Sequence, residues 1–184
     1  MDLLLSISIG LGLSAACGYR VFVPLLGMSI AASQGYLSLS EGMQWIGTEE
    51  ARIAFAAATA AEIAAYYIPV VDNMLDAIAA PAAVTAGTIV MASFFTDMSP
   101  LLRWSLAIIA GGGTAAIFQG STTLIRGTST AVTAGMGNFA FTSVETGISI
   151  VLTVLALLVP LITVAAVLTM MIIVLKIIIR KLTA

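Results

Sequence analysis

Two arginines stand inside long hydrophobic segments, where a charged side chain is costly. Arg20 lies in "CGYRVFVPL" (17–25), and Arg126 lies in "TLIRGTSTAVTAGMGN" (123–138). An arginine within a membrane span costs roughly 2.5–3.5 kcal/mol on insertion scales, so it usually faces a cavity or a partner. We therefore expect Arg20 and Arg126 to bind a substrate. The alternative is a structural role, in which each arginine reaches the membrane interface or pairs with a carboxylate.

Glycines, a proline and hydroxyls around these arginines predict that both helices are broken. Glycine allows the tight backbone path that a re-entrant segment needs. A broken helix also exposes backbone N–H groups at the start of its second half, and such a positive dipole end suits an anion. The residues expected to form the two breaks are Gly18, Pro24, Gly127, Gly135 and Gly137. The hydroxyls expected to bind the solute beside Arg126 are those of Thr128, Ser129 and Thr130.

Acidic residues between the arginines extend this candidate site. Glu62 lies among alanines in "TAAEIAAYY", and we expect a counter-ion of an arginine or a proton-coupling group there. Asp72 and Asp76 are four residues apart, share a helix face, and with Asn73 suit ion binding or coupling. In the alternative interpretation Asp72 or Asn73 caps a helix and Asp76 is a first-turn acid. Glu145, next to the start of a span, favours the same simple interpretation.

The residue types present argue against an enzyme. The chain has no histidine, which removes histidine-based zinc sites and Ser–His pairs, and leaves Cys17 without an activating base. Asp72 and Asp76 share one helix, whereas intramembrane aspartyl proteases use aspartates from two spans. We therefore expect no catalytic residue, cofactor or metal. The net charge of −2 also argues against a nucleic-acid partner.

The composition is that of a polytopic α-helical membrane protein. Hydrophobic residues make up 60% of the chain and charged residues 9%, whereas a soluble domain carries roughly 25% charged residues. Several apolar runs approach or exceed the roughly 20 residues that cross a bilayer. The expected spans are 3–32 with a break at Arg20, about 50–68, about 74–95, about 101–125, about 144–160, and 160 to about 179.

The order of these features predicts two repeats, in residues 1–98 and 99–184. Each half reads as a span that breaks at an arginine, a long span, a proline and another long span. Three spans per half is an odd number, so the second repeat is expected to be inverted relative to the first. Lys176, Arg180 and Lys181 predict a cytoplasmic C-terminus, and six spans then place the N-terminus there too. Tyr66 is expected to be an interfacial anchor at the end of its span.

Three segments resemble a family of small bacterial integral membrane proteins that is classed as a domain of unknown function. They are "GYRVFVPLL" (18–26), "EIAAYYIPVVDNMLDAI" (62–78) and "GSTTLIRGTSTAVTAGMGN" (120–138), and the similarity covers most of residues 5–160. The resemblance implies a bacterial inner-membrane protein. It also implies that one constellation unites Gly18, Arg20, Pro24, Glu62, Pro69, Asp72, Asp76 and Arg126. Tyr66 departs from the pattern, since family members often have aspartate there.

These observations favour a small transporter or channel with a midplane polar site for a small, anionic solute. A homodimer is expected, because so short a chain has little room to enclose a pathway alone. One alternative is a structural or accessory membrane subunit. Another is a protein that handles lipids or lipid phosphates, in which an arginine grips a headgroup. A lateral opening between spans would favour this last function.

Overall fold

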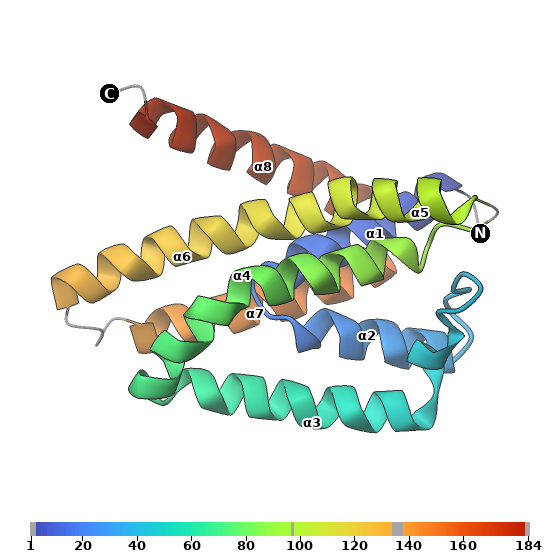
Figure 1. Ribbon diagram of the computed structural model, residues 1–184, viewed down its shortest axis with the longest axis horizontal. Helices are drawn as coiled ribbons and strands as arrows, with labels where there is room; N and C mark the ends of the chain where they lie inside the picture. The colour runs from blue at the N-terminus through green and yellow to red at the C-terminus, as the bar shows by residue number, and fades with distance from the viewer. Residues whose placement is uncertain (1–2, 97, 134–137, 183–184) are drawn as a thin grey trace.

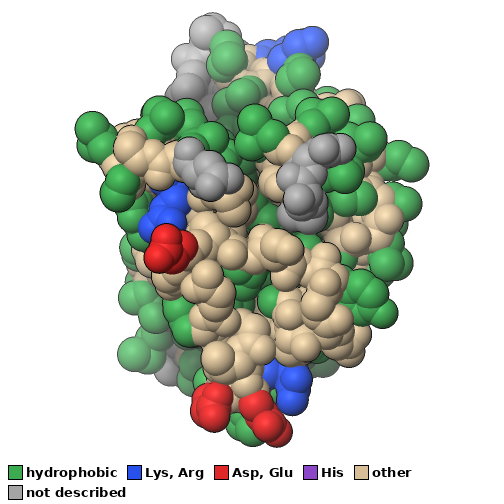
Figure 2. Space-filling view, turned by 90° about the vertical axis from the view of Figure 1, so that its right-hand side faces the viewer, with side chains coloured by type: hydrophobic (Ala, Val, Ile, Leu, Met, Phe, Trp, Pro, Cys, Tyr) green, Lys and Arg blue, Asp and Glu red, His purple; other side chains and the backbone are tan. Residues whose placement is uncertain are grey.

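The computed structural model describes residues 3–96, 98–133 and 138–182, and every regular element in them is helical (Figure 1). Three helical stretches are long and apolar enough to cross a membrane: Met74–Ala92, Pro100–Ser129 and Asn138–Leu158. Figure 2 looks along the bundle at one end, where hydrophobic side chains line most of the circumference and the few charged side chains lie near the edge of the view. An apolar circumference of this kind is what a bilayer requires, so the chain is an all-α protein with membrane-type helices.

The first apolar segment is a hairpin of two short helices, α1 (Leu3–Cys17) and α2 (Phe22–Ser33). Helix α1 runs antiparallel to α4 (Pro69–Ala92), because the Ser14 hydroxyl donates to the Gly87 carbonyl at 3.0 Å and Gly10 packs on Met91. Helix α2 runs antiparallel to α3 (Glu49–Tyr66), whose two ends contact the opposite ends of α2. The start of α1 and the end of α2 therefore lie at the same end of the bundle.

This hairpin does not cross the bundle. Its helices have 15 and 12 residues, so they are about 22 and 18 Å long, short of the roughly 30 Å of a hydrocarbon core. The tip, residues 18–21, lies inside the protein, and the break predicted at Gly18 and Arg20 is confirmed. Pro24, also predicted to form the break, lies instead inside the first turn of α2, where a missing N–H costs little.

The start of α3 is as predicted, and the start of α4 is not. A short 3₁₀ helix, η1 (Gln44–Gly47), precedes α3, and the Thr48 hydroxyl caps α3 by accepting from the amide of Ala51 at 3.2 Å. The prediction that Asp72 or Asn73 caps the next helix is wrong. Ile68 occupies the cap position, and Pro69 lies in the first turn. Because proline has no backbone N–H, this start of the helix has one amide fewer that needs a side-chain cap.

The predicted break at Arg126 is wrong. Helix α5 (Pro100–Leu106), a π-helical turn η2 (Ala107–Gly112) and α6 (Gly113–Thr133) follow one another, and α6 is continuous through Arg126 and Gly127. The hydroxyls of Thr122, Thr123 and Thr128 donate to carbonyls one turn earlier, so they are satisfied within the helix and do not interrupt it. Gly135 and Gly137 lie outside the described residues.

Two further helices, α7 (Asn138–Leu158) and α8 (Pro160–Leu182), complete the bundle. In Figure 1 the start of α1 and the end of α8 lie towards opposite ends of the long axis, because the hairpin returns to the end where it began. This arrangement differs from the expectation of two termini on one side. Among the described helices only the first segment is broken, so the six-span inverted repeat stays a prediction.

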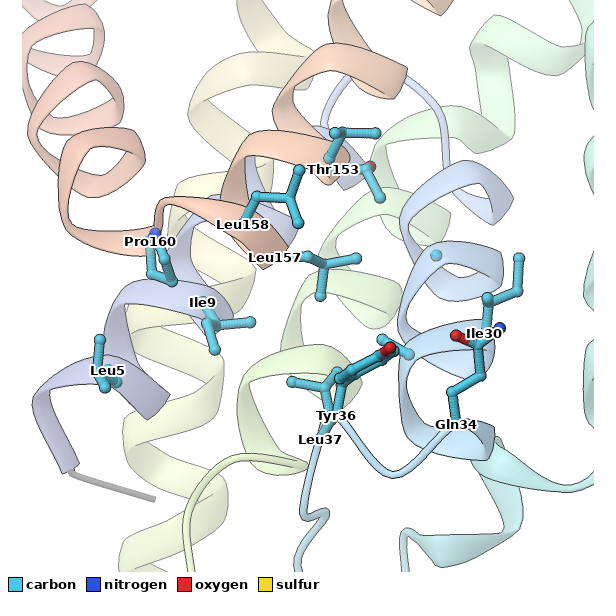
Figure 3. Close-up of a pocket in the computed structure, with 13 residues that line it drawn as sticks. Leu5, Ile9, Ile30, Gln34, Tyr36, Leu37, Thr153, Leu157, Leu158 and Pro160 are labelled. Atoms are coloured by element: carbon cyan, nitrogen blue, oxygen red, sulfur yellow. The ribbon is translucent and has the colours of Figure 1, made fainter.

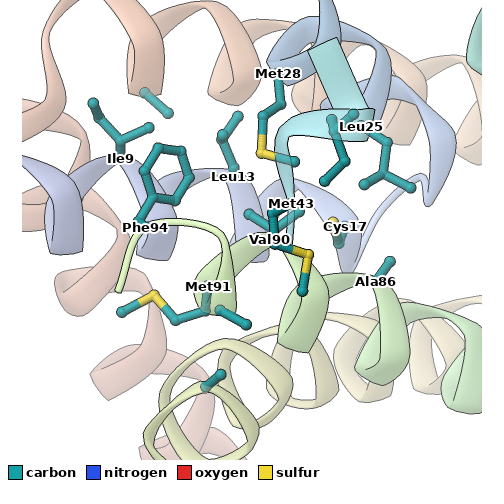
Figure 4. Packing of buried hydrophobic residues seen from close by; sticks show 14 of the residues in the cluster. Ile9, Leu13, Cys17, Leu25, Met28, Met43, Ala86, Val90, Met91 and Phe94 are labelled. Carbon is teal, nitrogen blue, oxygen red and sulfur yellow. The ribbon is translucent and has the colours of Figure 1, made fainter. Parts of the chain in front are cut away.

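The apolar core fills the space between the hairpin and α4. Figure 4 shows Ile9 and Leu13 from α1, Met28 from α2, and Val90 and Met91 from α4 packed together. Close helix contacts depend on glycine where two backbones meet. A Cβ on Gly111 in η2 would lie 2.3 Å from the Gly87 carbonyl oxygen of α4. Helix α4 and the π-helical turn can therefore approach only because neither position carries a side chain.

We predict that Gly111→Ala lowers stability by about 1–3 kcal/mol, the usual cost of overpacking a tight contact. Gly113→Ala, on the same continuous helix but facing open space, is the matched control and should be neutral or slightly stabilising. The melting temperatures of the two variants in detergent, compared with that of the unchanged protein, test this prediction. Equal shifts for both would contradict the role given to the Gly87–Gly111 contact.

Candidate functional site

A buried carboxylate, that of Glu145 on α7, joins both arginines. Arg20 donates from Nη1 to Glu145 Oε2 at 3.2 Å, and Arg126 donates from Nε to both Glu145 oxygens at 3.0 Å. Both arginine residues are only 2% exposed. Two guanidinium groups buried so completely need anionic partners, and Glu145 serves both. We call the charge network the set Arg20, Glu62, Asp72, Asp76, Arg126 and Glu145.

Arg126 also binds the two aspartates of α4. Its Nη1 is paired with Asp72 and lies 3.7 Å from Asp76 Oδ1, while its Nη2 donates to Glu145 and, at 3.0 Å, to the Thr142 hydroxyl. A guanidinium has five N–H donors; four of them make hydrogen bonds here, and the fifth, on Nη1, faces the Asp76 carboxylate. The expected role of Arg126 as an anion ligand therefore has little support, because its donors already point to protein groups.

Arg20 fixes the tip of the hairpin to α7. Its Nε donates to the Thr146 hydroxyl at 3.0 Å and its Nη2 to the Thr142 carbonyl at 3.1 Å. Its Nη1 also donates to the carbonyl of the preceding residue, Tyr19, at 2.9 Å. The only arginine of the tip thus joins the loop to two successive turns of another helix.

Tyr66 is buried against both arginines inside the bundle, so the expectation of an interfacial anchor is wrong. The guanidinium carbon of Arg20 is 4.1 Å from the centre of the Tyr66 ring, and that of Arg126 is 4.7 Å away. The aromatic face carries partial negative charge and attracts both cations. The Tyr66 ring therefore lies within cation–π distance of both guanidinium groups.

Glu62 binds backbone amides instead of an arginine side chain. Its carboxylate accepts hydrogen bonds from the amides of Val21 at 2.8 Å and Phe22 at 3.0 Å. These amides begin α2, whose own cap residue supplies no side-chain hydrogen bond. A carboxylate from α3 thus caps α2 and interacts with the positive end of its dipole. Among the described contacts Glu62 has no ion pair with an arginine, although the counter-ion of an arginine was one of the two roles expected for it.

The remaining predicted residues lie apart from this network or outside the described side chains. Thr128 is exposed and donates to the Leu124 carbonyl at 2.8 Å, and Gly127 faces open space. Ser129 is partly buried on α6. The side chains of Asn73 and Thr130 are not among those that the structure describes. In the described residues no group of three or more histidine, cysteine, aspartate and glutamate side chains is arranged to hold a metal ion.

Sequence reasoning missed Glu145 and Asn138. The span containing Glu145 was expected to begin near 144, which made this acid a first-turn residue, but α7 begins at Asn138 and Glu145 lies about 10 Å along it. Asn138 donates from Nδ2 to Asp72 Oδ2 at 3.2 Å. The signal that was available is the polar series 138, 142, 145, 146 and 149, whose spacing places these residues on one face of a helix that starts earlier.

Comparison with known proteins assigns the chain to a family. The family model described as "Domain of unknown function (DUF4126)" matches residues 7–181. The chain belongs to this family. Neither a curated protein nor a solved structure matches it. Membership in DUF4126 thus agrees with the resemblance to a family of unknown function, and it supplies no activity.

We predict that Arg126→Met destabilises this DUF4126 protein by about 3–5 kcal/mol, since it leaves Asp72 and Glu145 buried without their shared cation. Arg52→Met is the control, because Arg52 makes an exposed pair with Glu49 that is worth at most about 1 kcal/mol. The loss is measured as a shift in the detergent unfolding midpoint. Similar shifts for both variants would show that the buried pairs contribute no more than a surface pair.

We predict that Glu62→Ala loosens the hairpin tip. Two backbone amides lose their acceptor, at a cost of about 1–3 kcal/mol, while Glu62→Gln keeps one oxygen and is milder. Amide exchange of a peptide covering 18–26, followed by mass spectrometry, should be at least several-fold faster in Glu62→Ala. Glu50→Ala, at the exposed start of α3, is the control. If the amide exchange rate of the 18–26 peptide were unchanged in Glu62→Ala, the capping role of Glu62 would be contradicted.

Proposed function

We propose that this protein is a small membrane transporter or channel whose polar site is the charge network at the tip of the re-entrant hairpin. The observation that carries the proposal is the position of that tip, which leaves helical conformation inside the bundle and bonds to Glu62 of α3 and to Glu145 of α7, the acid that also binds Arg126 of α6. Irregular backbone at membrane depth is tolerated where it is buried in protein or lines a water-filled path. Ionisable residues at such depth commonly belong to ion or proton pathways.

The charges of the network favour a proton or a small cation over the anion expected from sequence. The network holds four carboxyl groups, those of Glu62, Asp72, Asp76 and Glu145, against the two guanidinium groups of Arg20 and Arg126, so acids are in excess. The Asp76 side chain is 22% exposed, whereas those of Asp72 and Glu145 are below 10%. Asp76 is also the most distant of the carboxylates paired with Arg126, which makes it the acid best placed to exchange a proton or bind a cation.

The competing function is structural. It is favoured by the contacts of Arg126, because all the N–H donors of its guanidinium group face groups of the same chain. A network that only holds helices together would give the same hydrogen bonds and no flux. The bacterial inner-membrane location and the homodimer stay predictions, and neither is needed to separate transport from a structural role.

Flux through reconstituted vesicles tests the proposal. We expect vesicles that hold the protein and a trapped pH indicator to equilibrate an imposed proton or sodium gradient faster than protein-free vesicles. Asp76→Asn should lower this flux at least tenfold, because the exposed carboxyl group is lost. Glu50→Gln, at the exposed start of α3, should leave it unchanged.

Two results would contradict transport of protons or small cations. One is flux no greater than in protein-free vesicles for protons, sodium and potassium alike. The other is flux that Asp76→Asn does not alter. Either result, with both variants folded and inserted, would favour the structural role.

A further inference from the structure

An apolar groove follows the outer side of α2. It consists of two hollows that share Gly27, Ile30, Thr153 and Val154. The larger hollow, of about 540 Å³, lies between α1, α2 and α7 (Figure 3). The smaller one, of about 260 Å³, lies between α2, α3 and α7. We call the two together the α2 groove, and its volume is in the range of sites that hold small molecules.

The floor of the groove is a close approach of α2 and α7. A Cβ on Gly27 would lie 2.3 Å from Cγ2 of Thr153, so the two helices touch there without a side chain from α2. Outside this contact the walls open sideways, since Ile30 and Val154 are 39% and 46% exposed. In a membrane such an opening faces hydrocarbon rather than water.

The groove has a polar mouth and an inner end near the charge network. Gln34 and Tyr36 line the mouth, at the end of the bundle where the hairpin opens, and Tyr36 is 75% exposed. The inner end is lined by Val23, Ile63 and Ile150. Ile63 follows Glu62 in sequence, and Val23 is next to Phe22, whose amide Glu62 binds. The groove therefore leads from the membrane surface along α2 towards the hairpin tip.

Two hydroxyls of the groove have no hydrogen-bond partner among the described residues. They are Oγ1 of Thr59 on α3 and Oγ1 of Thr153 on α7, and both residues line the smaller hollow. Thr153 is only 4% exposed. Threonines elsewhere on α7 and α8 behave differently, because Thr146, Thr163 and Thr169 donate to the carbonyl four residues earlier. A buried hydroxyl that leaves this bond unmade costs about 1–3 kcal/mol unless something else accepts from it.

We propose that the α2 groove binds a membrane phospholipid, with one acyl chain along α2 and an ester oxygen that accepts from the buried hydroxyl of Thr153 or Thr59 when the side chains covering it shift. The apolar walls match an acyl chain, the sideways opening gives access from the bilayer, and the unpartnered hydroxyls supply the donors that an ester lacks. Gln34 and Tyr36 at the mouth meet the polar end of the lipid. This site is distinct from the charge network, and the inference does not depend on transport.

The test uses a phosphatidylcholine that carries a photoreactive diazirine in one acyl chain, in vesicles containing the full-length protein. After irradiation, we expect labelling of peptides covering 23–30 and 150–157 to exceed that of exposed positions on α8 several-fold. Val154→Trp fills the groove and should lower this labelling at least fivefold. Val151→Trp is the matched control: it lies one turn earlier on α7, is similarly exposed and lines neither hollow, so labelling should persist.

A second variant keeps the proposal falsifiable if a tryptophan disturbs folding. Thr153→Val has nearly the same shape and removes a hydroxyl that bonds to no described residue, so the lipid-free protein should be as stable as before or more so. The same variant should retain less phosphatidylcholine through detergent washing, as counted by native mass spectrometry. The proposal would be overturned if the labelling of each peptide depended only on how exposed its residues are and did not change in Val154→Trp. Unchanged lipid retention in Thr153→Val would also overturn it.

Discussion

The shared carboxylate of Glu145 is the interaction on which the rest of this structure depends. Two guanidinium groups that approach one aromatic ring from two segments would repel each other if no anion lay between them. Glu145 lies between them and bonds to both, which ties the hairpin tip to α6 through α7. Asp72 then brings the start of α4 to the same point. Each of these charges is tolerable in the interior only while the others are present, so the network is cooperative.

The hairpin is the element that most needs this support. Its helices are too short to span a bilayer, and the amides at the start of α2 have no partner on their own helix. Glu62 supplies that partner from α3, and Arg20 holds the other side of the loop against α7. The α2 groove is the outer surface of the same arrangement, since it is bounded by the two helices, α3 and α7, that hold the tip. A lateral opening of this kind is also the feature that would favour a lipid-handling function.

Sequence reasoning succeeded where a local rule decided the outcome. The break at Arg20 and the boundaries of α3 follow from charge and helix-dipole preferences within a few residues. It failed where the outcome depends on distant partners. The sequence of a broken apolar segment is the same whether the segment crosses the bundle or turns back within it. Only its contacts with α3 and α4 show that this segment is a hairpin and not a kinked span. The hydroxyls near Arg126 suggested a break because their bonding within the helix cannot be read from their spacing. The network was foreseen in part, since Arg20, Arg126, Asp72 and Asp76 were expected together, whereas Glu145 and Tyr66 were given simpler roles.

The sequence separation within the network has a consequence for biosynthesis. The tip that carries Arg20 is made first, whereas Glu145 follows it by 125 residues. At about 5–20 residues per second, a ribosome needs about 6–25 s to cover that distance. Throughout this interval the arginine of the nascent hairpin lacks the acid that makes its burial tolerable. The buried position of the hairpin tip therefore becomes favourable only once α7 has been made.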